Sequence, residues 1–328
     1  MAVTMDPTTT PAGQVASPWR RRWTTQRVQR VLAWLAVITN GGIGVTGATV
    51  RVTGSGLGCP TWPQCAAGSL VPVSRSGMDA FHQAVEFTNR TLTAAVLLPS
   101  LGVFLALLLA PRRRRRLTLL AAVLPLGVLW QAVWGGITVH LGLAWWTVAP
   151  HMLVSLGLLF VAITVLVRVN ETDDPPVAVV PRPLRLLTWA TVGVLVLLCI
   201  AGTLVSAAGP HGGDSTTPRL GLPVATLAHL HADLMFTYFG LLIALTVGFA
   251  AVRAPRPLIR RAVVLVLLTG AQGLIGLVQY ATGVPEALVV SHVLGAVLLT
   301  AAAASVTLGT RVRSATERTG LSAYRTTG

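Results

Sequence analysis

Residues 131–151 read QAVWGGITVHLGLAWWTVAPH, and residues 272–292 read QGLIGLVQYATGVPEALVVSH. Shifted by 141 residues, the two segments match at four positions that hold glycine or a polar residue: Gln131 with Gln272, Gly135 with Gly276, Gly142 with Gly283, and His151 with His292. Each copy ends in a histidine at the start of an apolar run. Self-similarity at a fixed offset indicates duplicated structural units. The sequence therefore predicts a pseudo-symmetric membrane protein whose two halves each present a histidine at an equivalent place.

The composition favours the membrane as the solvent of this chain. Of its 328 residues, 53% are hydrophobic and 11% charged, with a mean hydropathy of +0.71, whereas a soluble domain carries about 25% charged residues. Eight apolar runs reach the length of about 20 residues that a spanning helix needs. They cover residues 31–50, 84–109, 117–139, 149–168, 186–207, 225–251, 262–281 and 289–309. We expect an all-α integral membrane protein with eight transmembrane helices in two pseudo-symmetric four-helix bundles.

The basic residues predict the topology. All 25 are arginines, and the formal net charge is +15. They lie between the apolar runs instead of forming a basic face, so they do not indicate a nucleic-acid-binding protein. Eight spans put both termini on one side, and 21 of the 25 arginines fall on that side. The excess of arginine on cytoplasmic loops predicts a multi-pass protein of the cell (plasma) membrane with both termini in the cytoplasm. The four arginines of the opposite side are Arg51, Arg75, Arg90 and Arg219.

The runs divide the chain into five parts. These are a disordered basic cytoplasmic tail (1–30), an N-terminal four-helix half (31–168), a cytoplasmic linker (169–185), a C-terminal four-helix half (186–309) and a second cytoplasmic tail (310–328).

The first outer loop is longer than its counterpart in the second half. Gly47, before this loop, matches Gly202 at an offset of 155 residues, against 141 later in the chain. The surplus surrounds Cys59 and Cys65, which lie on the outer side, where an oxidising compartment favours a disulfide. Cys199 falls inside an apolar run and reads as a small buried residue.

The histidines suggest where the chemistry lies. All seven fall at or near the outer ends of spans, at positions 82, 140, 151, 211, 229, 231 and 292. An ionisable residue at membrane depth is costly and usually functional. Paired imidazoles inside a helical bundle suit axial ligation of heme iron, and zinc is disfavoured because no dense cluster of ligands occurs. His229 and His231 point about 200° apart on a helix. We expect His231 to face His292, and His229 to lie at the rim.

A second group opens the 84–109 run. His82, Glu86, and Asn89 or Arg90 are spaced to share one helix face. One interpretation is a Glu86–Arg90 pair at the helix entrance. The other is a carboxylate that points into a pocket of low dielectric and transfers protons.

Five segments resemble the heme A synthase family, of the bacterial, actinobacterial-like type. They are residues 54–65 (GSGLGCPTWPQC), 86–90 (EFTNR), 135–139 (GGITV), 150–151 (PH) and 209–214 (GPHGGD). The first is the most specific, and the resemblance extends over nearly all of residues 31–309. The duplicated eight-helix architecture of that family agrees with the repeat and with the arginine pattern.

The resemblance implies an oxidoreductase that oxidises the C8 methyl group of heme O to a formyl group, giving heme A for terminal oxidases. It implies a heme b held between His231 and His292, and a substrate heme in the N-terminal half near His151. It makes Glu86 the acidic residue needed for turnover, and Cys59 and Cys65 the outer-loop cysteine pair. The expected partners are heme O and the lipid bilayer, and the farnesyltransferase that forms heme O is a candidate.

The chain departs from the family pattern at Asn89, where many members carry a histidine. Asn is a poor iron ligand. Either His82, about 10 Å away along the helix, supplies an imidazole, or His151 holds the substrate iron alone. His140 is a further candidate.

Other polar and aromatic residues near the outer side have two interpretations each. Arg51, Arg90 and Arg75 could pair with heme propionates, because arginine binds carboxylates bidentately, or could contact lipid headgroups. Trp62, Trp145 and Trp146 read as interface anchors.

Two other functions compete with the enzyme. A di-heme b-type electron-transfer protein would explain the paired histidines, but neither Glu86 nor the cysteine loop. A transporter built from repeats would place its polar site at the midplane, whereas here the polar residues gather at the outer ends.

Overall fold

The computed structural model describes residues 24–73, 79–112 and 114–313, so the tails outside 24–313 and Arg75 lie outside the described residues. Among the described residues, eight helices are long and apolar enough to cross a membrane. They are α2 (Gln26–Val52), α3 (Ala80–Leu108), α4 (Arg115–His140), α5 (Trp145–Asn170), α6 (Arg182–Ala208), α7 (Val224–Ala251), α8 (Arg256–Ala281) and α9 (Glu286–Gly309). The expected all-α, eight-span membrane protein is confirmed, and each helix contains one of the apolar runs or most of it.

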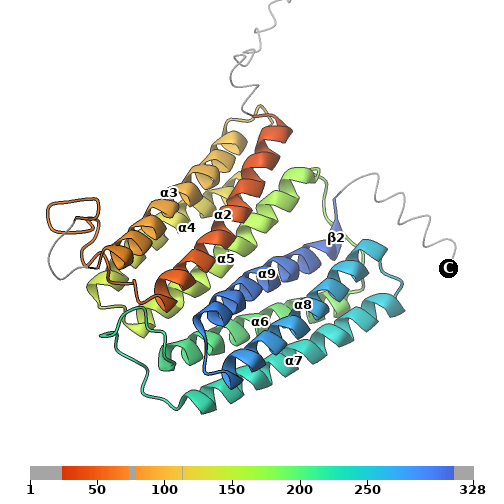
Figure 1. The fold of residues 1–328 in the computed structure, drawn as a ribbon. Coiled ribbons are helices and arrows are strands. Elements are labelled where there is room, and N and C mark those ends of the chain that lie inside the picture. The colour runs from red at the N-terminus through yellow and green to blue at the C-terminus, as the bar shows by residue number, and fades with distance from the viewer. Residues whose placement is uncertain (1–23, 74–78, 113, 314–328) are drawn as a thin grey trace, which may run out of the picture.

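The helices pack mainly within their own half of the chain. In the first half, α2 packs on α3 and α5, and α4 packs on the same two helices. In the second half, α6 and α8 each pack on α7 and α9. Figure 1 shows α2–α5 in the upper part of the view and α6–α9 in the lower part. The halves meet where α9 packs on α2 and α5. Two symmetric bundles remain a prediction, which this packing supports.

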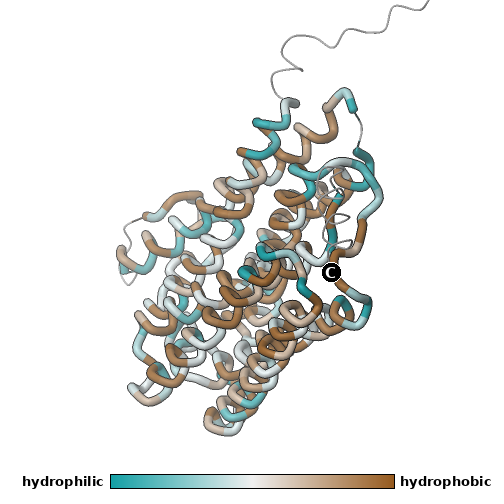
Figure 2. The backbone as a smooth tube through the Cα atoms, turned by 90° about the vertical axis from the view of Figure 1, so that its right-hand side faces the viewer, coloured by the Kyte–Doolittle hydropathy of each residue, from teal (hydrophilic) through white to brown (hydrophobic). Residues whose placement is uncertain are grey.

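Each half has its own apolar core, and a third cluster joins them. The core of the second half includes the fully buried Tyr238 and Phe249. That of the first half is built from small and aliphatic side chains of all four helices. Leu159 and Val297 belong to the cluster between α5 and α9. Many large apolar side chains stay exposed along the helices, as expected for surfaces that face lipid, and Figure 2 shows hydrophobic residues along their length.

The connections fall at two opposite ends of the helices. One, here called the loop end, contains residues 53–73, 79, 141–144, 209–223 and 282–285. The other, here called the arginine-rich end, contains residues 109–112, 114, 171–181, 252–255 and 310–313. In Figure 1 the long loop between α2 and α3 lies at the first of these ends, and β2 (Arg311–Val312) lies at the other.

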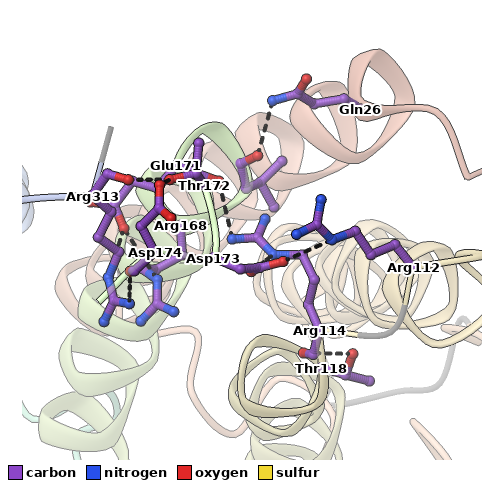
Figure 3. Close-up of polar contacts among 11 residues, drawn as sticks. Gln26, Arg112, Arg114, Thr118, Arg168, Glu171, Thr172, Asp173, Asp174 and Arg313 are labelled. Carbon is purple, nitrogen blue, oxygen red and sulfur yellow. Dashed lines mark hydrogen bonds and ion pairs between the residues drawn. The ribbon is translucent and has the colours of Figure 1, made fainter. Parts of the chain in front are cut away.

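Paired charges organise the arginine-rich end (Figure 3). Asp173 accepts a hydrogen bond from Arg114 over 2.5 Å. The Glu171 carboxylate lies 3.2 Å from Arg168 Nε and 3.5 Å from Arg313 Nε. Burial raises the pKa of the Glu171 carboxyl group, against the opposing effect of Arg168. The linker between the halves is therefore fastened to both α4 and the segment after α9.

Two boundaries differ from the expected ones. Helix α2 begins at Gln26, inside the expected disordered tail, because Thr25 caps it by accepting from the Val28 N–H, and Gln26 Nε2 donates to Val169 O over 3.2 Å. After α9, β2 (Arg311–Val312) pairs antiparallel with β1 (Val177–Ala178) of the linker. The start of the expected C-terminal tail is thus part of the fold, since strand pairing satisfies its backbone polar groups.

Candidate functional site

Two histidines of the second half face each other across its centre. His231 lies on α7 and His292 on α9, and both helices pack on α6 and α8, so they lie diagonally. The two ring centroids are 6.2 Å apart, and the ring planes are inclined by 60°. Two metal–nitrogen bonds of about 2 Å each, together with the half-widths of two imidazole rings, span about 6 Å. The pair therefore has the separation that a shared metal ion requires.

The surroundings of these rings suit axial ligation. His231 Nδ1 lies 3.1 Å from Leu198 O, and because a carbonyl oxygen only accepts, Nδ1 carries the proton and Nε2 keeps its lone pair for a metal. His292 Nδ1 is buried, with no hydrogen-bond partner among the described residues. His229, two residues before His231, is exposed. The expected orientation of the two histidines of α7 is thus what the structure has.

The repeated segments have the same local geometry. Gln131 Nε2 donates to His151 O over 2.9 Å, and Gln272 Nε2 donates to His292 O over 2.6 Å. In both halves the glycine of the intervening turn has positive φ, 60° at Gly142 and 77° at Gly283. Such backbone favours glycine. The repeat therefore reflects one local structure that occurs twice. In each copy, a glutamine on one helix donates a hydrogen bond to the backbone carbonyl of the histidine on the next helix.

The glutamines are the site residues whose role the sequence did not reveal. Gln131 matches Gln272 at the offset of 141 residues, so the repeat marks both positions. The sequence does not indicate, however, which group a glutamine amide will bond. In the first half, Gln131 Nε2 also donates to Ser155 Oγ over 2.6 Å. The second half has Ala296 at that position.

Glu86 and Arg90 hold the cysteine loop. Glu86 is 5% exposed, and its Oε2 accepts from the Cys59 N–H over 2.6 Å. Its Oε1 accepts from Arg90 Nε over 3.0 Å. Arg90 also donates to the Cys59 and Thr61 carbonyl oxygens, each over 2.7 Å. The Glu86–Arg90 pair of the first interpretation therefore exists, and Oε2 of the same carboxylate binds the loop backbone at Cys59. Proton transfer by Glu86, the second interpretation, stays a prediction.

The cysteine loop lies against the helices of the first half. Cys59 and Cys65 form a disulfide, as expected. A Cβ placed on Gly136 of α4 would lie 2.5 Å from the Trp62 ring, so this ring packs onto the helix instead of acting only as an interface anchor. Gly136 follows Gly135, whose own Cβ position lies 3.5 Å from His151 Cε1. The loop therefore covers the region of α4 that borders His151.

Asn89 and His82 have separate partners on α3. Asn89 Oδ1 accepts a hydrogen bond from Thr46 Oγ1 of α2 over 2.7 Å. His82 Nδ1 lies 2.8 Å from Ser55 Oγ, in the loop before the disulfide. Of the α3 group, Glu86 and Arg90 contact each other, whereas His82 and Asn89 contact other parts of the chain.

The remaining candidates lie outside this arrangement. His140 is exposed. Arg51 Nε donates to His211 O over 2.5 Å, and another Arg51 nitrogen donates to Ser206 O, so Arg51 fastens the loop of the second half to α2. Trp146 is 52% exposed.

The donor set of the second half consists of two imidazoles that face each other. Within the described residues, no three His, Cys, Asp or Glu side chains gather to enclose a metal ion. Ligation by two imidazoles, with the other ligands supplied by a porphyrin, fits the second half.

Comparison with known proteins gives three matches. A family described as "Cytochrome oxidase assembly protein" (COX15-CtaA) matches residues 30–211. A protein named heme A synthase from Staphylococcus haemolyticus (strain JCSC1435) is 27% identical over 190 residues, which cover 54% of this chain and 59% of that protein. A heme A synthase from Geobacillus thermodenitrificans is 40% identical over 53 residues, 16% of this chain and 15% of that protein. The chain thus matches less than two thirds of the length of either relative.

Proposed function

Because the chain belongs to the cytochrome oxidase assembly family (COX15-CtaA), we propose that it is a heme A synthase, a membrane oxidoreductase that converts the C8 methyl group of heme O into the formyl group of heme A for terminal oxidases. The observation that carries the proposal is the His231–His292 pair, whose ring centroids lie 6.2 Å apart. A duplicate of one member of the pair, His151, stands in the other half.

The two halves bind different hemes in this proposal. His231 and His292 hold a heme b, which when bound supplies one-electron chemistry for the oxidation. His151 holds the substrate heme in the first half. Gln131 and Gln272 position the helical turns of α5 and α9 that contain His151 and His292.

The cysteine loop closes the substrate side. Glu86 and Arg90 keep the loop in place through Cys59 and Thr61. All three nitrogens of the Arg90 guanidinium already donate to Glu86 or to loop carbonyls. Arg90 therefore serves the substrate heme through the loop and not by pairing with a propionate. The enzyme that farnesylates heme is the expected donor of heme O.

The test is chromatography of hemes extracted from cells that make heme O, with and without this chain. We expect heme A to appear only when the chain is expressed. Folded, heme-loaded protein in cells that contain only heme O and heme B would contradict the proposal and favour the di-heme electron-transfer protein.

We further propose that the arginine-rich end, with both termini, faces the cytoplasm of the cell membrane. Single cysteines test this in a Cys199→Ala background, since Cys59 and Cys65 form a disulfide. Ser215→Cys at the loop end should react with a membrane-impermeant thiol reagent on intact cells. Arg182→Cys, exposed at the start of α6, should react only after permeabilisation. The reverse pattern would invert the topology.

A further inference from the structure

Each of three histidines rests its ring on a glycine of a neighbouring helix. A Cβ placed on Gly202 of α6 would lie 3.0 Å from Cε1 of His231, and one on Gly276 of α8 would lie 3.1 Å from Cε1 of His292. In the first half, Gly135 has the same relation to His151, at 3.5 Å. At Gly202 and Gly276 a larger residue would press on the imidazole, whereas at Gly135 an added Cβ would make an ordinary van der Waals contact with the ring. These three glycines are ring seats, each next to a histidine proposed to bind iron.

Gly47 is a fourth glycine in an equivalent position, but among the described residues no imidazole ring packs on it. Gly47 of α2 corresponds to Gly202 at the offset of 155 residues, and a Cβ placed on Gly47 would meet no atom of the described residues within 4 Å. The α3 residue that reaches α2 here is Asn89, whose Oδ1 is bonded to the neighbouring Thr46. The residue that corresponds to Thr46 is Ala201, which has no hydroxyl group. The first half therefore has the Asn89 amide, which is bonded to Thr46 of α2, and open space at Gly47 among the described residues. The second half has the His231 imidazole, which packs on Gly202.

His82 does not fill this space. It lies seven residues before Asn89, about 10 Å along the helix. Its Nδ1 is 2.8 Å from the hydroxyl of Ser55, a fully buried residue. The backbone of the same turn is pinned as well, because a Cβ on Gly58 would lie 2.3 Å from His82 O. His82 is thus built into the loop end.

We propose that His151 is the one side chain of the described first half that would ligate a heme iron, and that the free space at Gly47, next to the Thr46–Asn89 contact, would admit a small diatomic ligand such as O₂ or CO. This inference rests on the proposed function, because it takes the first half to bind a heme. The second half contrasts with it, since His231 and His292 face each other there and would both ligate the iron of a bound heme. A side chain beside an open axial position governs which ligand binds, and the Asn89 amide nitrogen is a donor.

The test uses the full-length protein purified with both hemes. We expect a high-spin ferric signal from about half of the heme, and CO binding to about half after reduction. Asn89→His supplies the missing imidazole, so it should convert the high-spin signal to low-spin and lower CO affinity by at least about tenfold, since an endogenous ligand must first leave. Thr46→Ala removes the tie without adding a ligand and should keep CO binding. His151→Ala should remove the CO-binding heme only, and the remaining low-spin heme reports that the protein is folded.

Two results would overturn this inference. One is a wild-type protein in which both hemes are low-spin and neither binds CO. The other is a new CO site in His82→Ala, which would make His82 the second ligand. Both readouts are independent of heme A formation: a protein that makes heme A with two low-spin hemes refutes the open position alone, whereas one with an open position that makes no heme A refutes the proposed function alone.

Discussion

His231→Ala is expected to remove the heme of the second half and to lower heme A formation by at least about tenfold, because even a residue that only orients a metal ligand is worth 10–100-fold in metal affinity. His231 is the histidine of α7 whose ring faces His292. His292 would face an empty position across the bundle, and Gly202 would lose the ring packed on it.

His229→Ala is the matched control. His229 lies on the same helix, two residues away, but is exposed, about 200° around the helix axis from His231. This variant should keep the wild-type heme content and heme A yield. The measurements are the ratio of heme to protein after purification, the low-spin signal in the ferric state, and heme chromatography of the cells. Equal losses in the two variants would mean that His231 acts only through the stability of α7, and the assignment of axial ligands would then be wrong.

The span pattern and the repeat are what the sequence predicted best. Both arise from periodic or duplicated signals. Apolar runs of bilayer length predict helices almost regardless of their neighbours, and a matched offset identifies equivalent positions without any knowledge of contacts. The glycines at 135 and 276 were visible in this way before their role as ring seats was known.

Long-range polar contacts could not be predicted. Arg51 is one example: its position near the outer side suggested a propionate partner, but its guanidinium donates to the carbonyl oxygens of Ser206 and His211, about 160 residues away. Backbone carbonyls carry no sequence signal, so no pattern indicates that they will be acceptors. The pairing of β1 with β2 depends in the same way on two short segments that are distant in sequence.

The cysteine loop has one feature that the sequence predicted and others that it did not. Its length and its two cysteines indicated a special structure, whereas the Glu86 and Arg90 contacts to its backbone, and the packing of Trp62 on Gly136, came only from the fold. The spacing of four residues places Glu86 and Arg90 side by side on α3, but it does not indicate that the backbone of the cysteine loop will be their partner.

Glu86→Ala is expected to lower heme A formation by at least about tenfold and to loosen the cysteine loop. The substitution removes the acceptor of the Cys59 N–H and leaves the Arg90 side chain, 19% exposed, without its carboxylate. Removing one partner of a buried ion pair costs about 3–5 kcal/mol, because the remaining charge is uncompensated. The variant should therefore show faster reduction of the Cys59–Cys65 disulfide by an added thiol, measured by alkylation and mass spectrometry.

Asp79→Ala and Glu86→Gln separate the effects of that substitution. Asp79 caps the same helix from an exposed position by accepting from the Phe81 N–H over 2.7 Å, so its loss should cost about 1 kcal/mol of helix stability and leave the disulfide and heme A unchanged. Glu86→Gln keeps one acceptor oxygen but also presents an NH₂ group, which would face either the Cys59 N–H or Arg90, both of which are donors. Its disulfide should thus be reduced at a rate between those of wild type and Glu86→Ala. If heme A is lost in both Glu86 variants while the reduction rate stays at the wild-type value, the loop-holding role is wrong, and the carboxylate acts on the substrate side by proton transfer instead.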